Sequence, residues 1–255
     1  MKVATWNINS IRAREERVLA WLKNYQPDVL CLQELKGTDD VFPQEAIEAL
    51  GYHCALFGQP TYNGVAILSK TPPEDVTRSF GDGVEDSHAR FIAATVKGVR
   101  ILNGYFPNGG EIDSDKYVYK LAWLERLDTY LDALDANKPV LLCGDFNIAP
   151  SALDTANADK REGNVLFNPT VRGWFEKTLE RGFTDTFRHL YPEEEQYSWW
   201  DYRNLSFPKN TGMRIDHILV NELLKQRLQE VWIDRDERKG KKPSDHVPVM
   251  ATFAD

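Results

Sequence analysis

The chain has 255 residues, 42% of them hydrophobic, so it can bury a substantial core as one large domain or two small ones. No apolar run approaches the roughly 20 residues that span a bilayer, and the first segment, MKVATWNINS, lacks the apolar core of a signal peptide, so we expect a cytoplasmic protein without membrane contact. The net charge of −8 argues against an indiscriminate nucleic-acid binder, which is usually basic, but suits an enzyme that gathers carboxylates around a cation.

The N-terminal half of the chain is predicted to be rich in strands. Residues 3–9 alternate apolar and polar side chains, which is typical of a half-buried strand. Ser10 can cap a helix over residues 11–24, whose apolar side chains repeat at helical spacing. Further strand patterns, rich in β-branched and aromatic residues, follow at 28–34, 53–57, 64–69, 91–96 and 100–106.

The C-terminal half combines longer helices with strands. Ser114 can cap a helix that runs to Ala136, in which leucines repeat at helical spacing. Pro169 precedes another helix, which ends before Gly182. Strand patterns occur at 140–146, 214–220, 231–234 and 247–253.

These elements predict an α/β sandwich. The strands between residues 53 and 106 follow one another without helices, which excludes a strict βαβ array. About ten strands with a few helices suit two packed β-sheets whose outer faces are covered by the helices. No repeat, low-complexity segment or Pro/Ser-rich linker interrupts the chain, so we expect residues 1–255 to form a single domain.

Two further features have an ordinary structural interpretation. Cys31, Cys54 and Cys143 lie in apolar, strand-like segments, and an odd number of cysteines without metal-ligand spacing indicates buried, reduced thiols. The basic segment RDERKGKK, residues 235–242, is interpreted as a solvated loop in preference to a phosphate contact.

Polar residues of a restricted kind stand at the ends of several predicted strands. A buried carboxylate without a partner costs several kcal/mol, so each one needs a cation, an imidazole or hydrogen-bond donors. One aspartate at a strand end is usually only the start of a loop. A set made solely of Asn, Asp, Glu and His predicts a site for a hard cation such as Mg²⁺, which takes oxygen ligands. The set comprises Asn7, Asn9, Glu34, Asp145, Asn147, Asp216, Asp245 and His246.

Eight segments carry a resemblance to a known family. In chain order they are TWNINSIRA, DVLCLQELK, NGVAILSK, NGYFPNG, LLCGDFNIAP, YSWWDYR, RIDHIL and PSDHVPV. Together they resemble the exonuclease III branch of the exonuclease–endonuclease–phosphatase superfamily, the abasic-site endonucleases, over nearly the whole chain, Lys2 to Phe253. The resemblance implies a DNase I-like fold, which is a four-layered α/β sandwich of two mixed sheets flanked by helices. It also implies Mg²⁺-dependent hydrolysis of DNA, with Mn²⁺ as an alternative cofactor.

The resemblance also implies roles for the residues of the polar set. Glu34 corresponds to the principal metal ligand, with Asn7 and Asp245 close by. Asp145 corresponds to the aspartate that orients or deprotonates the attacking water, and Asn147 to the asparagine that holds the scissile phosphate. From the residues alone, the asparagine of GDFN could equally cap a turn.

Four other residues complete the implied catalytic site. His246 corresponds to a histidine that contacts a phosphate oxygen, and Asp216 to the buried acid that fixes the tautomer of that histidine. Tyr105 corresponds to a tyrosine at the scissile phosphate, and Asn108 lies beside it in the sequence. Taken in isolation, Tyr105 is more simply a core tyrosine. The other histidines match no motif and are interpreted as structural.

An aromatic-rich stretch, residues 195–217, is the expected reader of the DNA. The resemblance implies that Trp200, Phe207 and Met213 line a pocket for an extruded abasic sugar. Many relatives have an aromatic residue or leucine in place of Met213, so its flexible thioether could widen the pocket. The alternative is an aromatic mini-core beneath a long loop. Contacts to the DNA backbone are expected from Arg12, Lys36, Asn63, Lys120, Asn164 and Arg203.

Several functions are compatible with this set of residues. The first is a DNA-repair nuclease, expected to act as a monomer, that cleaves duplex DNA 5′ to abasic sites and has 3′–5′ exonuclease and 3′-phosphodiesterase or phosphatase activity. Alternatives are a predominantly 3′–5′ exonuclease or damaged-base endonuclease, a phosphoesterase acting on inositol phosphates or sphingolipids, and an inactive nucleic-acid-binding module. The last would require a missing catalytic residue, and none is missing.

Overall fold

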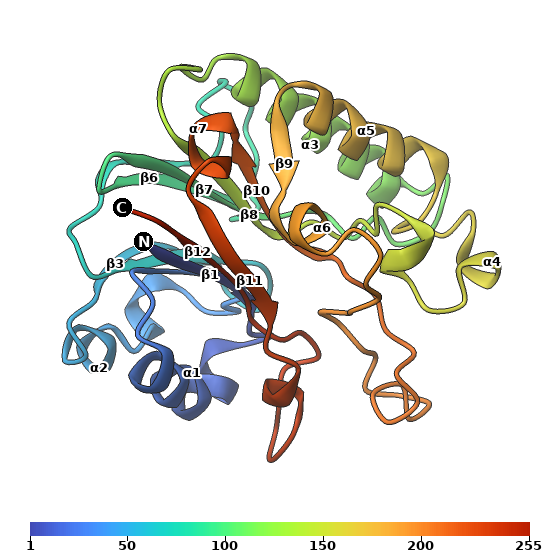
Figure 1. Cartoon of the computed structure of the whole chain (residues 1–255). Coiled ribbons are helices and arrows are strands. Elements are labelled where there is room, and N and C mark those ends of the chain that lie inside the picture. Colours follow the sequence, from blue (N-terminus) through green and yellow to red (C-terminus); the bar gives the residue numbers. More distant parts are fainter.

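The computed structural model describes all 255 residues, Met1–Asp255, as two six-stranded sheets packed face to face. Helices cover the outer face of each sheet, so the four-layered α/β sandwich expected from the sequence is confirmed (Figure 1). The two chain ends lie side by side, because the first and last strands are antiparallel neighbours. None of the helices combines the length and the apolar character that crossing a membrane requires.

The first sheet joins the two ends of the chain. Its strand order is β11-β12-β1-β2-β4-β3, in which only the β1–β2 pair is parallel. The helices α1 and α2 pack on its outer face, where Trp6, Trp21 and Leu30 belong to one apolar cluster. The bounds are β1 Lys2–Asn7, α1 Ile11–Tyr25, β2 Val29–Gln33, α2 Gln44–Glu48, β3 His53–Phe57, β4 Val65–Ser69, β11 Leu228–Ile233 and β12 Val249–Phe253.

The second sheet is built from the middle of the chain. Its order is β5-β6-β7-β8-β10-β9, and only the β7–β8 pair is parallel. The long helices α3 and α5 cover its outer face (Figure 1). The bounds are β5 Glu74–Arg78, β6 Phe91–Val96, β7 Val99–Tyr105, α3 Asp115–Asp132, β8 Val140–Asp145, α4 Ala158–Arg161, α5 Pro169–Glu180, β9 Phe183–Asp185, α6 Thr186–Leu190, β10 Asp216–Asn221 and α7 Glu222–Lys225. Short 3₁₀ turns lie at Asp39–Val41, Ala152–Asp154 and Arg235–Arg238.

The main core lies between the two sheets. Alternate residues of each strand point into it, including Val3 and Cys31 from the first sheet and Ile101 and Cys143 from the second. All three thiols are free, as predicted, but Cys54 is only partly buried. It belongs to edge strand β3 and packs at the margin of the outer cluster, so the prediction of full burial was wrong for this residue.

The elements of the structure differ from the predicted ones in a few places. The strands β5 and β9 were not predicted, because β5 is a largely exposed edge strand with few apolar residues and β9 has only three residues. The helix predicted to reach Ala136 ends at Asp132. The basic segment 235–242 is only partly a solvated loop, because the guanidinium of Arg238 is buried over Tyr202, at 4.8 Å from its ring.

The two predicted serine caps have different outcomes. Ser114 caps α3 through its Oγ, which accepts a hydrogen bond from the N–H of Tyr117 at 3.2 Å. Ser10 makes no side-chain cap, because its φ of 91° departs from the extended conformation that a capping serine adopts. Instead, its N–H donates to the carbonyl of Glu34 at 2.8 Å. This contact holds the start of α1 against the loop that follows β2.

A close approach of two backbones explains one glycine. Gly144 in β8 pairs with Gly104 in β7, and a Cβ added at Gly144 would lie 1.8 Å from the carbonyl oxygen of Gly104. Gly144 also has a φ of 143°, a conformation that other residues rarely adopt. The next residue is Asp145, so the glycine pair brings the end of β8 close to the end of β7.

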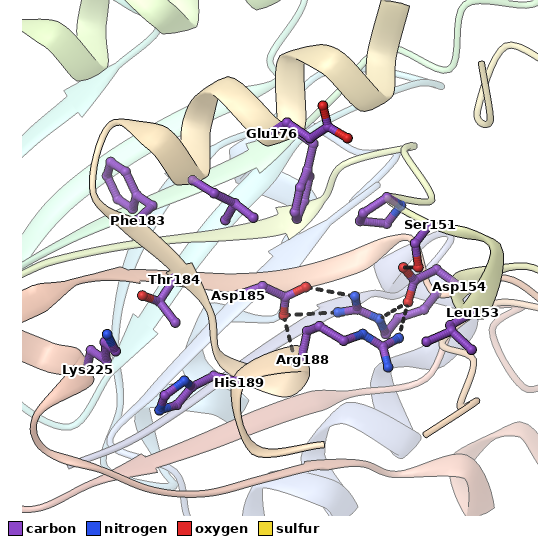
Figure 2. Close-up of a pocket in the computed structure, with 14 residues that line it drawn as sticks. Ser151, Leu153, Asp154, Glu176, Phe183, Thr184, Asp185, Arg188, His189 and Lys225 are labelled. Carbon is purple, nitrogen blue, oxygen red and sulfur yellow. Dashed lines mark hydrogen bonds and ion pairs between the residues drawn. The ribbon is translucent and has the colours of Figure 1, made fainter. Parts of the chain in front are cut away.

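An ionic network lies beside β9 and β10, in the wall of a cavity of about 630 Å³ (Figure 2). The buried Arg214 donates to Asp154 Oδ1 and to Asp185 Oδ2, both at 2.7 Å, and Arg188 donates to Asp154 at 2.6 Å. Burial alone would raise the pKa of Asp154, but the two arginines outweigh it and lower that pKa to about 2. Arg214 lies two residues before the start of β10, so this network anchors the strand that carries Asp216.

His217 belongs to the same network and not to the candidate site. Its Nε2 lies 2.8 Å from the carbonyl oxygen of Ile148, and its Nδ1 lies 3.1 Å from the guanidinium of Arg214. A carbonyl only accepts and a guanidinium only donates, so the ring is neutral with its hydrogen on Nε2. The buried ring therefore has the structural role predicted for it.

Candidate active site

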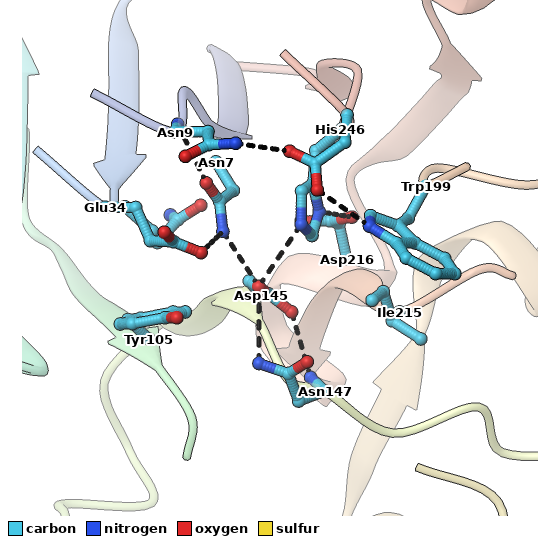
Figure 3. Close-up of polar contacts among 12 residues, drawn as sticks. Asn7, Asn9, Glu34, Tyr105, Asp145, Asn147, Trp199, Ile215, Asp216 and His246 are labelled. Carbon is cyan, nitrogen blue, oxygen red and sulfur yellow. Dashed lines mark hydrogen bonds and ion pairs between the residues drawn. The ribbon is translucent and has the colours of Figure 1, made fainter. Parts of the chain in front are cut away.

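Polar residues from both sheets meet at one end of the sandwich (Figure 3). Asn7 ends β1 in the first sheet, and Asp145 ends β8 in the second. Asp216 begins β10 and pairs in register with Asp145. Glu34 directly follows β2, and His246 precedes β12. The strand ends named in the sequence therefore come together, although the strands belong to different sheets.

Asn7 links the two sheets at the centre of this site. Its Nδ2 donates to Glu34 Oε1 and to Asp145 Oδ2, each at 2.9 Å. Its Oδ1 accepts from the N–H of Asn9 at 3.0 Å, which fixes the orientation of the amide. Asn7 thereby holds the two carboxylates next to each other.

Two carboxylates could hold a metal ion together, and an imidazole lies beside them. Ligand atoms of Glu34, Asp145 and His246 all lie within 4.8 Å of one another. Two of the three are carboxylates, and hard divalent cations prefer such oxygen ligands, so the donors fit a cation of the Mg²⁺ class. Lys36 Nζ lies 2.9 Å from Glu34 Oε2 and partly compensates the negative charge. Glu34 has a φ of 53°, a strained conformation that recurs at functional sites.

Asp245 was predicted to be a metal ligand but lies outside this group of three. Its Oδ2 accepts from Trp199 Nε1 and its Oδ1 from Asn9 Nδ2, both at 3.0 Å. Burial would raise the pKa of Asp245, but His246 and the two donors outweigh it and lower that pKa. The carboxylate is thus ionised and held at the rim of the site.

His246 is held by the acid predicted for it. Its Nδ1 lies 2.8 Å from Asp216 Oδ2, and its Nε2 lies 3.6 Å from Asp145 Oδ2. Burial would lower the pKa of His246, but Asp216 and Asp145 outweigh it and raise that pKa to about 10. The imidazole is therefore protonated at neutral pH, and its Nε2–H points toward the carboxylates.

The surroundings of Asp145 favour the protonated form of its carboxyl group. Its side chain is buried, and this burial together with the charges of Asp216 and Glu34 raises the pKa of the Asp145 carboxyl. His246 and the amide of Asn7 oppose the shift without cancelling it. A carboxylate with a raised pKa is a better proton acceptor, which is what a general base requires.

Tyr105 ends β7, and Asn108 and Asn147 lie in the loops that follow β7 and β8. Asn108 Nδ2 donates to Asn147 Oδ1 at 3.3 Å, and Asn147 Nδ2 donates to the carbonyl of Phe106 at 2.9 Å. The ring of Tyr105 is partly buried against the core, with the guanidinium of Arg90 at 4.7 Å from its centre. Tyr105 thus combines the ordinary core role with a place beside Asp145, its neighbour in the β7–β8 register.

The predicted sugar pocket is only partly present. Trp200 and Met213 are 0% exposed, so they have no surface that a substrate could touch, and the prediction for them was wrong in this structure. The aromatic mini-core is the better description, because Trp200 packs against Phe207 with ring centres 5.1 Å apart. Of the three predicted pocket residues, only Phe207 is partly exposed. The sulfur of Met213 is occupied by a contact with Arg161 Nη1 at 3.1 Å.

Trp199 is the residue that the sequence interpretation missed. It is partly exposed, and its indole N–H donates to Asp245 beside the candidate site. Neighbouring residues of an extended segment point to opposite sides, so only one residue of the Trp199–Trp200 pair can face the core. That alternation was the available signal, but it does not tell which tryptophan is inside.

Some of the predicted backbone contacts are placed where DNA could reach them. Arg12, Asn164 and Arg203 are exposed. Lys36 is partly exposed and bound to Glu34, so it belongs to the candidate metal site.

Two other predicted contacts were wrong because their side chains are buried. Asn63 donates to Gln59 Oε1 at 2.9 Å and is 5% exposed. Lys120 is 0% exposed and its amine is enclosed by backbone carbonyls, so it cannot bind a phosphate at the surface. A lysine on a helix is normally solvated, and nothing in the local sequence marks this one as buried.

Comparison with known proteins decides the family. The model of the endonuclease/exonuclease/phosphatase family matches residues 4–246. The chain belongs to this family. It is 40% identical to exodeoxyribonuclease III of Haemophilus influenzae, over 99% of this chain and 100% of the relative. The family resemblance drawn from the motifs and the prediction of a hydrolytic nuclease are therefore confirmed.

Solved structures of the family have the same fold. An AP endonuclease from Archaeoglobus fulgidus is 40% identical and superposes with a TM-score of 0.96, covering 99% of both chains. A 3′ phosphatase from Neisseria, solved with a product DNA hairpin, is 41% identical with a TM-score of 0.97, covering 100% of this chain and 99% of that one. The roles of the individual site residues stay predictions for this member of the family.

Proposed function

We propose that this chain is a metal-dependent DNA-repair nuclease that hydrolyses the phosphodiester 5′ to abasic sites in duplex DNA. It also removes nucleotides and blocking phosphates from 3′ ends. The observation that carries the proposal is the meeting of Asn7, Glu34, Asp145 and His246 at one end of the sandwich. The family members support the choice of substrate, because one is an AP endonuclease and another was solved with product DNA.

The geometry suits in-line attack of water on the scissile phosphorus. Asp145 accepts the proton of the attacking water, for which its raised pKa and buried position suit it. The new P–O bond forms as the bond to the 3′ oxygen breaks, and this leaving oxygen takes up a proton from solvent water to become a hydroxyl. The protonated His246 and the amide of Asn147 donate to phosphate oxygens and stabilise the negative charge of the transition state.

The cation belongs to the same proposal. Glu34 would hold Mg²⁺, or Mn²⁺ in its place, with Asn7 and Asp245 close by. When bound, the cation supplies positive charge that stabilises the developing charge on the phosphate.

A duplex with one abasic-site analogue tests the proposal. The protein is incubated with it in Mg²⁺, in Mn²⁺ and in chelator, beside an undamaged duplex with a recessed 3′ end. We expect metal-dependent incision 5′ to the lesion. Asp145→Asn should lower the rate by about 10²–10⁴-fold, the range found for general acid–base groups. Absence of incision at the lesion in either metal would overturn the endonuclease assignment, and full activity of Asp145→Asn would overturn the role of Asp145.

A second candidate is a predominantly 3′–5′ exonuclease of the same family. The burial of Trp200 and Met213 favours it, because these residues leave no open pocket for an extruded sugar. Rapid shortening of the undamaged duplex, with slow incision at the lesion, would identify this activity as the main one.

We also propose that the enzyme is a cytoplasmic monomer acting through a single catalytic domain, as the sequence predicts. The three free thiols suit a reducing compartment. Light scattering at several protein concentrations would test the monomeric state.

A further inference from the structure

Lys120 is an unusual residue of α3, because its side chain is fully buried without a carboxylate partner. It is 0% exposed and ranks among the largest fully buried side chains of the chain. No ion pair forms at its amine, while several arginines and lysines elsewhere pair with acids. Burial of a charge without a counter-ion is costly, and an apolar side chain at this position would avoid that cost.

The amine is satisfied by backbone carbonyls alone. Lys120 Nζ donates to the carbonyl of Asn147 at 2.7 Å, of Val165 at 3.1 Å and of Asn108 at 3.2 Å. An ammonium has three hydrogens, so each one has an acceptor. A neutral amine would donate only two hydrogens and would leave one carbonyl unsatisfied. Burial lowers the pKa of Lys120 to about 7, while the charge of Asp145 opposes this shift.

The three carbonyls belong to the loops that carry the candidate phosphate contacts. Asn147 follows the end of β8, and Asn108 lies in the loop after β7. The side chains of Asn108 and Asn147 are also bonded to each other, at 3.3 Å, so the two residues that Lys120 holds by their carbonyls form one unit. Asn147 also has a φ of 50°, a left-handed conformation that requires support from its surroundings.

We propose that Lys120 is a positioning residue, whose ammonium clamps the Asn108 and Asn147 loops so that the Asn147 amide faces the scissile phosphate. The proposal rests on the proposed function for its catalytic consequence. Lys120 touches neither substrate nor metal, and acts through the backbone of residues that do. A purely structural lysine would affect stability and the fraction of folded protein, but not the turnover of the molecules that fold.

The test replaces Lys120 by methionine, which keeps the length and removes the charge. The control is Leu127→Ala, a cavity variant of a fully buried residue seven positions further along the same helix, whose side chain has no polar atom to bond to either loop. For Lys120→Met we expect kcat on the abasic duplex to fall by roughly 10–100-fold, as for other residues that orient a site, with KM changed by less than about threefold. Leu127→Ala should lower the melting temperature and keep kcat within about twofold of the parent. If Lys120→Met does not fold, Lys120→Gln takes its place with the same expectation.

A double-mutant cycle identifies the partner. If Lys120 acts through Asn147, adding Lys120→Met to Asn147→Ala should slow the reaction by less than about threefold further. A kcat of Lys120→Met within twofold of the parent, or full additivity in the cycle, would overturn the proposal while leaving the nuclease function intact.

A measurement without substrate separates the two proposals. In ¹H–¹⁵N spectra, the side-chain amides of Asn108 and Asn147, assigned by substitution to aspartate, should shift or broaden in Lys120→Met and stay in place in Leu127→Ala. If the parent enzyme cleaves neither DNA substrate, the proposed function fails. The spectra then test by themselves whether Lys120 holds the Asn108 and Asn147 loops in place. Unchanged amide signals in Lys120→Met would then overturn this role of Lys120.

Discussion

His246 Nδ1 lies 2.8 Å from Asp216 Oδ2, although the two residues are 30 positions apart in the sequence. The same carboxylate oxygen accepts from Ser198 Oγ at 2.6 Å, so Asp216 is held independently of the histidine. Because a carboxylate only accepts, Nδ1 carries a hydrogen and Nε2 is directed to Asp145. The pair therefore determines both the orientation and the charge of the imidazole.

Asp216→Asn should lower kcat by roughly 10–100-fold, the range for residues that orient a functional group. The amide still accepts a hydrogen bond but no longer stabilises the imidazolium. Parent activity should fall as the pH rises through the pKa of His246, about 10, and this alkaline limb should move to lower pH in the variant. Steady-state incision assays over a pH series measure both effects. An unchanged kcat and pH profile would show that His246 does not depend on Asp216.

Glu34→Gln should weaken the binding of Mg²⁺ and Mn²⁺ by at least about tenfold, because it removes a charged oxygen ligand from the group of three. Isothermal titration of the protein with each cation measures the change without reference to activity. The exposed Asp236, which pairs only with Lys239, provides a matched control as Asp236→Asn. Equal cation affinity in Glu34→Gln and the control would place the metal elsewhere.

Substitution of the two adjacent tryptophans should affect different properties, KM for Trp199 and stability for Trp200. Trp199→Ala removes a partly exposed ring beside Asp245 and should raise KM for the abasic duplex roughly tenfold, as expected for loss of one stacking contact of about 1–3 kcal/mol. Trp200→Ala removes a fully buried ring and should lower the free energy of unfolding by about 3–5 kcal/mol. Urea unfolding and steady-state kinetics of both variants give the comparison. A raised KM in Trp200→Ala, with an unchanged KM in Trp199→Ala, would show that Trp200 is the pocket residue after all.

His217 should make stability depend on pH. Burial and the neighbouring Arg214 lower its pKa from 6.5 to about 4, so the unfolded chain takes up the proton first. The contribution of His217 to the free energy of unfolding is complete above pH 6.5 and is lost as the pH falls toward 4. This contribution amounts to at most about 3 kcal/mol. In His217→Gln this contribution is absent.

The difference in unfolding free energy between parent and His217→Gln, measured in urea from pH 7.5 to 4, isolates this effect. It should shrink as the pH falls. The raised pKa of Asp145 has the opposite dependence, since it favours the folded state at lower pH, but it contributes equally to both proteins and cancels. A difference that does not change with pH would show that His217 is not neutral in the fold.

Much of the candidate site could be predicted because its residues stand at recognisable places in the sequence. Asp145 follows a continuous apolar run, and Glu34 follows another, so both were predicted at strand ends. Because side chains alternate along a strand, Asp216 and His217 were predicted to face opposite sides, and their contacts with His246 and Ile148 confirm this. These features are local, and local patterns survive in any tertiary arrangement that keeps the strands.

What could not be predicted depends on which side of an element is covered. Trp200 is in the core and Trp199 is not, although both are aromatic and adjacent. Lys120 has the sequence context of a solvated helix residue, yet three loops close over it. Asp245 and His246 are neighbours, but only His246 reaches the carboxylates.

The sequence by itself determined ten of the twelve strands, the polar residues at their ends and the family of the chain, because periodicity and motif spacing are properties of the chain. The tertiary structure alone decided that Asn7 joins Glu34 to Asp145 and that Lys120 lies beneath Asn147. The Asn7–Asp145 contact joins the two sheets, and the Lys120–Asn147 contact joins a helix to the second sheet. Their free energies come from desolvation and hydrogen bonding between distant segments, which no local pattern records.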